Sequence, residues 1–293
     1  MMDYGKSIQD TINYIEEHLE EPLTLPVLAN IACFSPFHYH RVFLMLVGHP
    51  VMEYIRKRRL AHGAELLVHS RQKIVDIAFS CGFASHESFN RAFKKQFNVT
   101  PTQFRRARPH TFTLPQKATL TNQPIIGGPF MQPKIMVKPA FSVLGYELKT
   151  TSEDGRNLKD IPLFWQDYLR DPQMRKAIPN KKHPSVELGI CTNFNPENGT
   201  FSYLIGSEVT TAENAPSDLV LMHIPETRFA VFTTPSVPDD EFSNSIQGTW
   251  QYVFKEWFPS SDYEHAGCLE IEWYDERSAN PDSLQMDILI PIK

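Results

Sequence analysis

A short segment occurs twice in the N-terminal third of this 293-residue chain, and the repeat constrains the fold more than any other feature. Fifty residues separate Ser35 from Ser85, Tyr39 from Phe89, Arg41 from Arg91 and Phe43 from Phe93, and Ala29 upstream corresponds to Ala78. Each copy predicts a short helix with a small alanine, a tight connection and a second helix capped by serine. Close crossing of two helices requires such a small residue, so the repeat predicts two helix-turn-helix units.

The repeat lies in the first of two parts that differ in sequence pattern. Apolar residues recur at helical spacing up to residue 110, a stretch rich in proline and glycine follows, and β-branched and aromatic runs come after it. We therefore predict a multidomain chain: an all-α domain at 1–110, a linker at 111–132 and an α+β domain with an antiparallel sheet at 133–293. The expected helices include 51–68, 75–81, 85–97, 102–108, 158–169 and 239–257, and the expected strands include 135–137, 141–144, 201–204, 219–222 and 229–232.

Charge is distributed unevenly between the two parts. Residues 1–110 contain 14 lysines and arginines against 10 aspartates and glutamates, whereas the rest of the chain contains 15 against 24. A basic part suits a polyanion such as DNA, and an acidic part repels one. Because the sequence has neither an apolar run of bilayer length nor a signal-peptide pattern at its start, we expect a cytoplasmic protein that does not contact a membrane.

The four cysteines, Cys33, Cys81, Cys191 and Cys268, are too far apart for a metal-binding or redox motif. Their neighbours are apolar, so we interpret them as small buried residues. A redox sensor is the less favoured alternative. The sequence predicts no metal site and no cofactor.

The second helix of each repeat presents polar side chains on the face opposite its aromatic residues. In the first copy we expect Phe37, His40 and Arg41 to be exposed, and in the second His86, Glu87, Asn90 and Arg91. Arginine, asparagine and glutamate are groups that read base edges in the major groove. A solvated polar face is the usual explanation for one such helix, but it does not require arginine at the same point of both copies. The repeat therefore favours two DNA-reading helices.

The second copy resembles the signature of the AraC/XylS family of transcription regulators. The resemblance rests on the segments 77–78, 82–85, 89–97, 100–101 and 104–106 and covers roughly the first 110 residues. It implies base contacts from Phe37, His40, Arg41, His86, Glu87, Asn90 and Arg91. It implies phosphate contacts, which position the protein without specifying sequence, from Lys94, Lys95 and Arg106. Glu87 departs from the neutral side chain common in this family, which puts the base preferred at that point in doubt.

The second part is similar to the GyrI-like effector-binding domain, and the order of the two parts resembles that of Rob-type regulators. Short segments carry this similarity, among them 164–165, 188–190, 229–232, 249–250, 256–259, 271–274 and 287–292. The implied fold has two pseudo-repeated strand-helix-strand-strand units that share a concave surface.

The resemblance implies that Glu272 is the acid of a ligand pocket, with Trp165, Tyr203, Trp250 and Tyr274 as walls. Strand alternation places Glu272 on the same face as Glu270. A carboxylate among aromatic rings suits a lipophilic cation, through charge and cation–π attraction. The alternative is that both glutamates face water and the aromatic residues belong to the core.

We therefore interpret the chain as a sequence-specific DNA-binding transcription regulator whose second domain senses a small molecule, and not as an enzyme. A ligand would bias contacts with DNA or with RNA polymerase, and two reading helices in one chain would let a monomer occupy a whole site on double-stranded DNA. Two alternatives stay open for the second domain: a hydrolase that uses the pocket glutamate, and a protein-interaction module. The sequence contains no Gly-x-Ser-x-Gly, HExxH or phosphate-loop motif.

Overall fold

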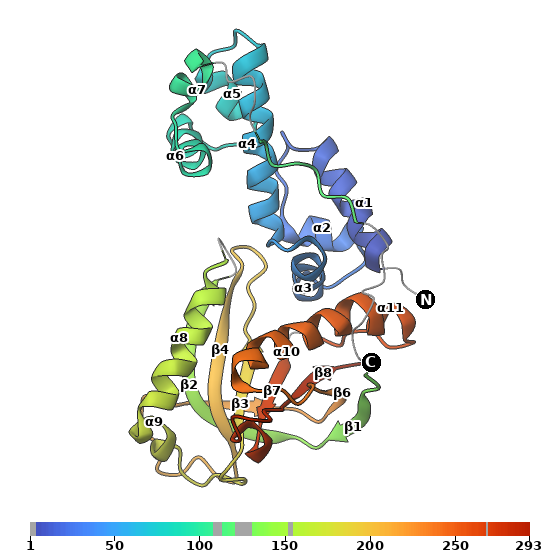
Figure 1. Cartoon of the computed structure of the whole chain (residues 1–293), viewed down its shortest axis with the longest axis vertical. Helices are drawn as coiled ribbons and strands as arrows, with labels where there is room; N and C mark the ends of the chain where they lie inside the picture. Colours follow the sequence, from blue (N-terminus) through green and yellow to red (C-terminus); the bar gives the residue numbers. More distant parts are fainter. Residues whose placement is uncertain (1–3, 108–112, 121–130, 152–154, 268) are drawn as a thin grey trace. The chain divides into compact units, whose positions relative to one another are not determined.

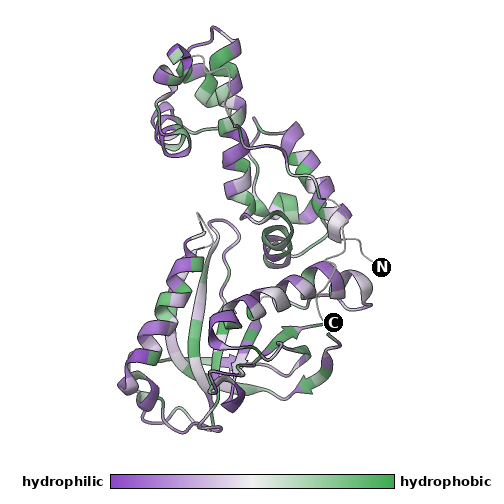
Figure 2. Cartoon of the chain, in the orientation of Figure 1, coloured by the Kyte–Doolittle hydropathy of each residue, from purple (hydrophilic) through white to green (hydrophobic). Residues whose placement is uncertain are grey.

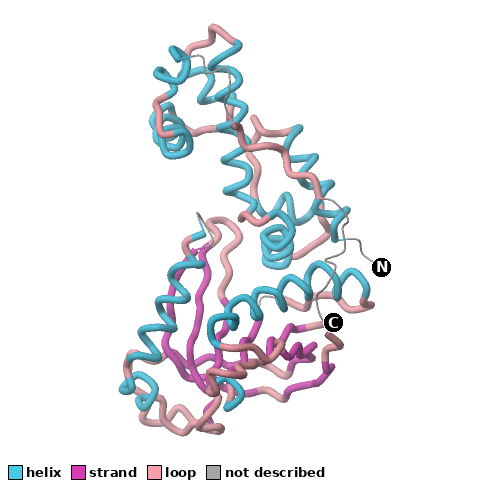
Figure 3. Tube along the Cα trace, in the orientation of Figure 1, coloured by secondary structure: helices cyan, strands magenta, loops and turns pink. Residues whose placement is uncertain are grey.

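The computed structural model describes residues 4–107, 113–120, 131–151, 155–267 and 269–293. The chain divides into two compact units, one at Tyr4–Asn122 and the other chiefly at Gln123–Lys293. The first is helical, and all the strands that the structure describes lie in the second (Figures 1 and 3). The predicted fold class is confirmed in both units.

Two helix-turn-helix units make up the helical unit, and one long helix joins them. The helices are α1 (Tyr4–Glu17), α2 (Leu25–Ile31), α3 (Pro36–Val47), α4 (Val51–His69), α5 (Ile74–Ser80), α6 (His86–Phe97) and α7 (Pro101–Ala107). The pairs α2–α3 and α5–α6 are the two copies of the repeat, and α4 is the joining helix. The helices predicted at 51–68, 75–81, 85–97 and 102–108 agree with α4, α5, α6 and α7 to within one residue at each end.

The two repeated helices begin and pack in the same way. The hydroxyl oxygen of Ser35 accepts a hydrogen bond from the backbone N–H of His38 at the start of α3. At the start of α6, Ser85 and Ser88 cap each other's backbone N–H groups in a capping box. The equivalent aromatic pairs, Tyr39 with Phe43 and Phe89 with Phe93, are fully buried as predicted.

Arg59 on α4 connects the segment that precedes the first helix-turn-helix unit to the turn of the second unit. Its guanidinium donates to the backbone carbonyls of Leu19 and Glu21, before the first unit, and to that of Gly82 in the turn of the second. Gly82 has φ of +71°, and a β-carbon there would lie 2.7 Å from the Arg59 guanidinium carbon. Glycine thus provides both the left-handed turn and the space for the arginine.

The helical unit extends beyond the boundary predicted at residue 110. Residues 113–120, which the prediction assigned to a linker, pack along the helices. Leu114 packs against the apolar core of the second helix-turn-helix unit. The N–H of Ala118 donates to the Tyr54 hydroxyl, and that of Leu120 donates to the side chain of Gln9 on α1. Hydrophobic contact and backbone hydrogen bonds therefore hold this segment in place along both helix-turn-helix units.

The second unit is one eight-stranded antiparallel sheet in the order β1-β6-β8-β7-β3-β4-β2-β5. The strands are β1 (Lys134–Lys138), β2 (Phe141–Thr151), β3 (Glu187–Thr192), β4 (Thr200–Val209), β5 (Val220–Ile224), β6 (Thr227–Thr233), β7 (Glu270–Tyr274) and β8 (Asp287–Pro291). If each of β1–β4 is exchanged with its counterpart in β5–β8 (β1 with β5, β2 with β6, and so on), the strand order becomes its own reverse. The two halves of the sheet are therefore related by a pseudo-two-fold axis through the β3–β7 pair. The first strand of each half is exchanged: β1 pairs with β6 and β5 pairs with β2.

The helices of this unit are α8 (Asn157–Arg170), α9 (Pro172–Ala177), α10 (Asp239–Tyr252) and α11 (Phe258–Ser260). Apolar and polar patches alternate along α8 (Figure 2), and its apolar side packs on β2 and β4. The helix predicted at 239–257 is only partly correct, because a π-helical turn at Val253–Trp257 follows α10. Strands β3 and β8 and helix α9 were not predicted.

Two further expectations concern the burial of the cysteines and the presence of membrane-spanning helices. Cys81 is buried as expected, and Cys191 is only half-buried. Cys33 is exposed, so the interpretation of the cysteines as buried residues is wrong at that position, and Cys268 lies outside the described residues. Within the described ranges, no helix is both long and apolar enough to span a membrane.

Candidate DNA-binding face and effector site

Helix α6 presents an open cationic face. Glu87, Arg91, Lys94 and Lys95 are exposed along it, and His86 and Asn90 are half-buried. The Asn90 amide lies 3.1 Å from a ring nitrogen of His86, one turn earlier, so these two polar groups hold each other in place. Arg106 on α7 is also exposed. The predicted residues on α6 thus share one accessible face of the helix.

A shallow hollow of about 820 Å³ follows this face and continues to the start of α7. The residues that line it are Glu87, Asn90, Arg91, Lys94, Lys95, Thr100 and Thr102. Hydrogen bonds from its own backbone N–H and from the Ser85 hydroxyl lower the pKa of Glu87, so this residue is an anion at neutral pH. A hollow with three cations and one acceptor carboxylate provides groups for phosphates and for a base amino group.

The first copy differs from its prediction. Phe37 and His40 are each only 7% exposed, although we expected both on an open face, and Arg41 is half-buried. The sequence of α3, PFHYHRVFLMLV, explains the difference, because its apolar residues surround the helix. A helix that is apolar on all sides is covered, whereas α6, with charged residues on one side, keeps an open face.

In the sheet-containing unit, the five predicted pocket residues lie together and are joined by hydrogen bonds around Glu272. The hydroxyl of Tyr203 on β4 donates to Glu272 Oε2 at 2.6 Å, and the hydroxyl of Tyr274 donates to the same oxygen at 3.2 Å. The indole N–H of Trp250 on α10 lies 3.4 Å from Oε1, and that of Trp165 on α8 donates to the Tyr203 hydroxyl at 2.9 Å. Two strands and two helices therefore meet at one half-buried carboxylate.

Burial and the negative charge of Glu272 raise the pKa values of Tyr203 and Tyr274 well above that of free tyrosine. Both hydroxyls are therefore protonated at neutral pH and serve as donors. An ionised carboxylate is an acceptor only, so this set of donors suits a charged Glu272.

Gly189, which the sequence analysis did not identify as a site residue, makes this arrangement possible. It lies on β3 directly opposite Glu272 on β7. A β-carbon at Gly189 would lie 2.1 Å from the Tyr203 hydroxyl oxygen and 3.0 Å from Glu272 Oε2. The missing side chain gives Tyr203 the space to reach across β3 to the carboxylate. An isolated glycine within a strand pattern is a signal of such close approach.

Glu270 lies on the same face of β7 as Glu272, as predicted, but in different surroundings. It is 2% exposed, and Oε1 of its carboxylate lies 3.3 Å from Nε2 of the buried His265, whose ring packs near Phe254 and Phe258. The alternative in which both glutamates face water is therefore wrong for Glu270. This pair could not be predicted from the sequence pattern, because His265 lies in a connection between elements.

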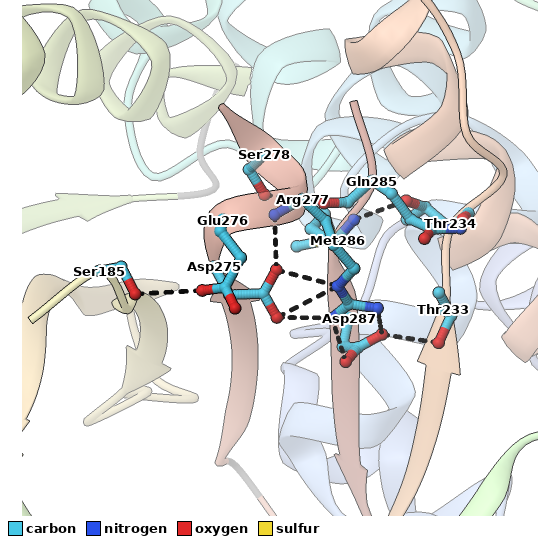
Figure 4. A network of polar contacts seen from close by, with 10 residues as sticks. All are labelled: Ser185, Thr233, Thr234, Asp275, Glu276, Arg277, Ser278, Gln285, Met286 and Asp287. Atoms are coloured by element: carbon cyan, nitrogen blue, oxygen red, sulfur yellow. Dashed lines mark hydrogen bonds and ion pairs between the residues drawn. The ribbon is translucent and has the colours of Figure 1, made fainter. Parts of the chain in front are cut away.

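The far end of β7 is fixed by Arg277, as Figure 4 shows. Its guanidinium donates to Asp275 at 2.8 Å and to Asp287, the first residue of β8, at 2.7 Å. The Thr233 hydroxyl, at the end of β6, donates to Asp287 at 2.6 Å. The hydrogen bonds with both aspartates raise the pKa of Arg277, which stays charged. These contacts hold together the ends of β6, β7 and β8, and β7 carries Glu272.

Among the described residues, no three histidine, cysteine, aspartate or glutamate side chains are placed to hold a metal ion.

Comparison with known families matches both units. A family model described as "Cass2: Integron-associated effector binding protein" matches residues 134–292, more than half of the chain. A second, described as "Helix-turn-helix domain", matches residues 28–107.

Individual relatives match parts of the chain. The uncharacterised helix-turn-helix regulator YbfP of Bacillus subtilis is 44% identical over 104 residues, which are 36% of this chain and 35% of YbfP. The transcriptional regulator Rob of Salmonella typhimurium is 38% identical over 203 residues, 64% of this chain and 65% of Rob. This chain thus covers less than two thirds of the length of either relative. A solved structure titled "The structure of SAV2435 bound to TETRAPHENYLPHOSPHONIUM" is 13% identical, covers 56% of this chain and 94% of its own, and has a TM-score of 0.47.

Proposed function

Because the chain belongs to the family of integron-associated effector binding proteins and also carries an AraC-type helix-turn-helix module, we propose that it is a DNA-binding transcription regulator controlled by a small molecule. The observation that carries the DNA-binding part is the open cationic face of α6. Such a regulator acts where the chromosome is, in the cytoplasm.

In this proposal Arg91, Asn90 and Glu87 contact base edges, and Lys94 and Lys95 contact phosphates. Binding of the purified protein to duplexes selected from a random pool is measured by fluorescence anisotropy. Arg91→Ala weakens binding to the selected site by about 1–3 kcal/mol, whereas Lys134→Ala, an exposed cation on β1, leaves it unchanged.

The first helix-turn-helix unit reads bases only if Phe37 and His40 become accessible, since both are buried here. In that case Arg41→Ala weakens binding about as much as Arg91→Ala, and one chain occupies a whole site as a monomer. Unchanged affinity in both arginine variants contradicts the assignment of reading helices.

The C-terminal domain, we propose, binds a lipophilic cation at Glu272. Three aromatic donors hold the carboxylate, and the surrounding rings supply apolar area and negative faces for a cation. Binding there would change contacts with DNA or RNA polymerase by its different affinity for two states of the protein.

Thermal unfolding of the protein with increasing tetraphenylphosphonium tests this site. The melting temperature rises with concentration if the folded state binds the cation. Glu272→Gln abolishes the rise, and Glu197→Gln, which removes an exposed glutamate before β4, preserves it. An equal rise in both variants contradicts the role of Glu272. Consumption of a candidate compound would instead favour the hydrolase, and a co-purifying protein without cation binding would favour the interaction module.

A further inference from the structure

A second hollow of the effector unit lies beside α9, on residues outside the Glu272 cluster. It measures about 440 Å³, and three cationic side chains line it: Arg175, Lys176 and Lys181. Leu169, at the end of α8, and Ile178 give it apolar surface, together with two prolines. It thus combines a group of positive charges with an apolar wall.

One of the three cations is held rigidly. Arg175 Nε donates to Glu187 Oε1 at 2.7 Å, and the buried hydroxyl of Tyr168 donates to the same oxygen at 3.1 Å. Glu187 is buried and neutralises one positive charge. The Arg175 side chain is nevertheless 50% exposed, so part of it is accessible to a ligand in the hollow. Two positive charges of the hollow are left uncompensated.

Lys181 is the strongest indication of a binding site. Its backbone is fixed by a bridge to Val209, and the adjacent Lys182 is paired with Glu208. Lys181 itself is half-buried, and no described carboxylate lies within ion-pair distance of its ammonium group. Burial lowers the pKa of Lys181; the charge of Glu187 opposes this shift, and the charge of Arg175 adds to it. A cation that has lost part of its water without a carboxylate in direct contact is a candidate functional group in a hollow.

The surroundings make this positive group unusual. From Thr111 onward the chain carries 15 basic against 24 acidic residues, so the domain as a whole repels anions. A local excess of positive charge in such a domain gives selectivity for an anion that reaches it. The apolar wall adds affinity for a ligand with an apolar body.

We propose that this hollow binds a small organic anion, with a phosphate or carboxylate group between Lys181 and Arg175 and an apolar body against Leu169 and Ile178. The site would give the domain a second ligand of opposite charge to that proposed at Glu272.

Isothermal titration of the full-length protein tests the proposal with two probes of equal apolar body, phenyl phosphate and benzoate. At least one binds with a stoichiometry of one, and the tighter of the two identifies the preferred anionic group. Benzyl alcohol, which lacks the charge, does not bind. Lys181→Gln weakens binding by about tenfold or more, as expected for loss of a charge-assisted hydrogen bond. Lys134→Gln, with an exposed lysine on β1, has no effect.

The remaining outcomes separate this site from the others. Lys181→Gln is expected to unfold at the same temperature as the parent protein, which excludes misfolding as the cause of lost binding. Saturation with tetraphenylphosphonium leaves anion binding in place if the sites are distinct. Failure of both anions to bind, unchanged affinity in Lys181→Gln, or loss of binding in Lys94→Ala on the DNA-binding face would each overturn the proposal.

Discussion

Replacing Gly189 by alanine is the sharpest test of how the cluster around Glu272 is built. The added β-carbon would lie 2.1 Å from the Tyr203 hydroxyl oxygen, far inside van der Waals contact. The tyrosine must move, and its hydroxyl then loses the hydrogen bond it donates to Glu272 and the one it accepts from Trp165.

The expected cost follows from these contacts. A hydrogen bond to a charged group contributes about 1.5–3 kcal/mol. Crowding a packed site costs a further 1–3 kcal/mol or so. Gly189→Ala should therefore destabilise the domain by about 2.5–6 kcal/mol. In a Tyr203→Phe background the hydrogen bond is already lost and the nearest atom is gone, so the same alanine should cost only about 1–2 kcal/mol.

Urea unfolding followed by tryptophan fluorescence measures this difference. All four tryptophans, Trp165, Trp250, Trp257 and Trp273, lie in the effector domain, so the signal reports that domain and not the helical one. The parent, both single variants and the double variant form a mutant cycle. Costs that add to within about 0.5 kcal/mol would refute the claim that Gly189 exists to admit the Tyr203 hydroxyl.

Three further predictions concern other parts of the molecule. Gly82→Ala should lower the stability of the helical unit by about 1–3 kcal/mol, because it strains a left-handed turn and displaces Arg59. Unfolding followed by circular dichroism at 222 nm measures the change, and unchanged stability would show that the turn relaxes freely. Burial alone would raise the pKa of Glu208, but hydrogen bonds from two lysines hold it below its ordinary 4.5, so the contribution of Glu208 to stability is present above pH 4.5 and is lost as pH falls through the lower folded value. Glu208→Gln should therefore weaken the loss of stability at acid pH, measured by tryptophan fluorescence, and an unchanged pH dependence would count against the pairing. Lys94→Ala should weaken binding to all DNA sequences alike and reduce the slope of log affinity against log salt by about 0.9, whereas a sequence-dependent loss would make it a base contact.

The repeat in the sequence was sufficient to predict the helical architecture, because capping and the spacing of apolar residues are local properties. Ser35 and Ser85 cap helices by contacts within one turn, and the aromatic pairs four residues apart must share a face. Exposure is not local in this sense. Phe37 and His40 occupy positions that would be open on an ideal amphipathic helix, but α3 is apolar on all sides and they are covered.

The grouping of residues around Glu272 was predicted, but the way in which the fold builds it was not. Glu272 and its four aromatic neighbours came from resemblance to a family, and the structure brings them together. The role of Gly189 depends on which residue of β3 lies opposite Glu272, and strand register between distant segments cannot be obtained from spacing. The position of residues 113–120 was missed for a related reason, since an extended segment held by distant partners reads as a linker.

The exchange of first strands between the halves of the sheet has a consequence during synthesis on the ribosome. Strand β1 emerges early but has no partner until β6 is made, about ninety residues later, and β8 must then join β6 to β7. The helical unit, whose contacts are complete by Asn122, can fold while the rest of the chain is still being translated. A nascent chain would thus acquire its DNA-binding surface first, and the cluster around Glu272, which requires β7, only when synthesis is nearly finished.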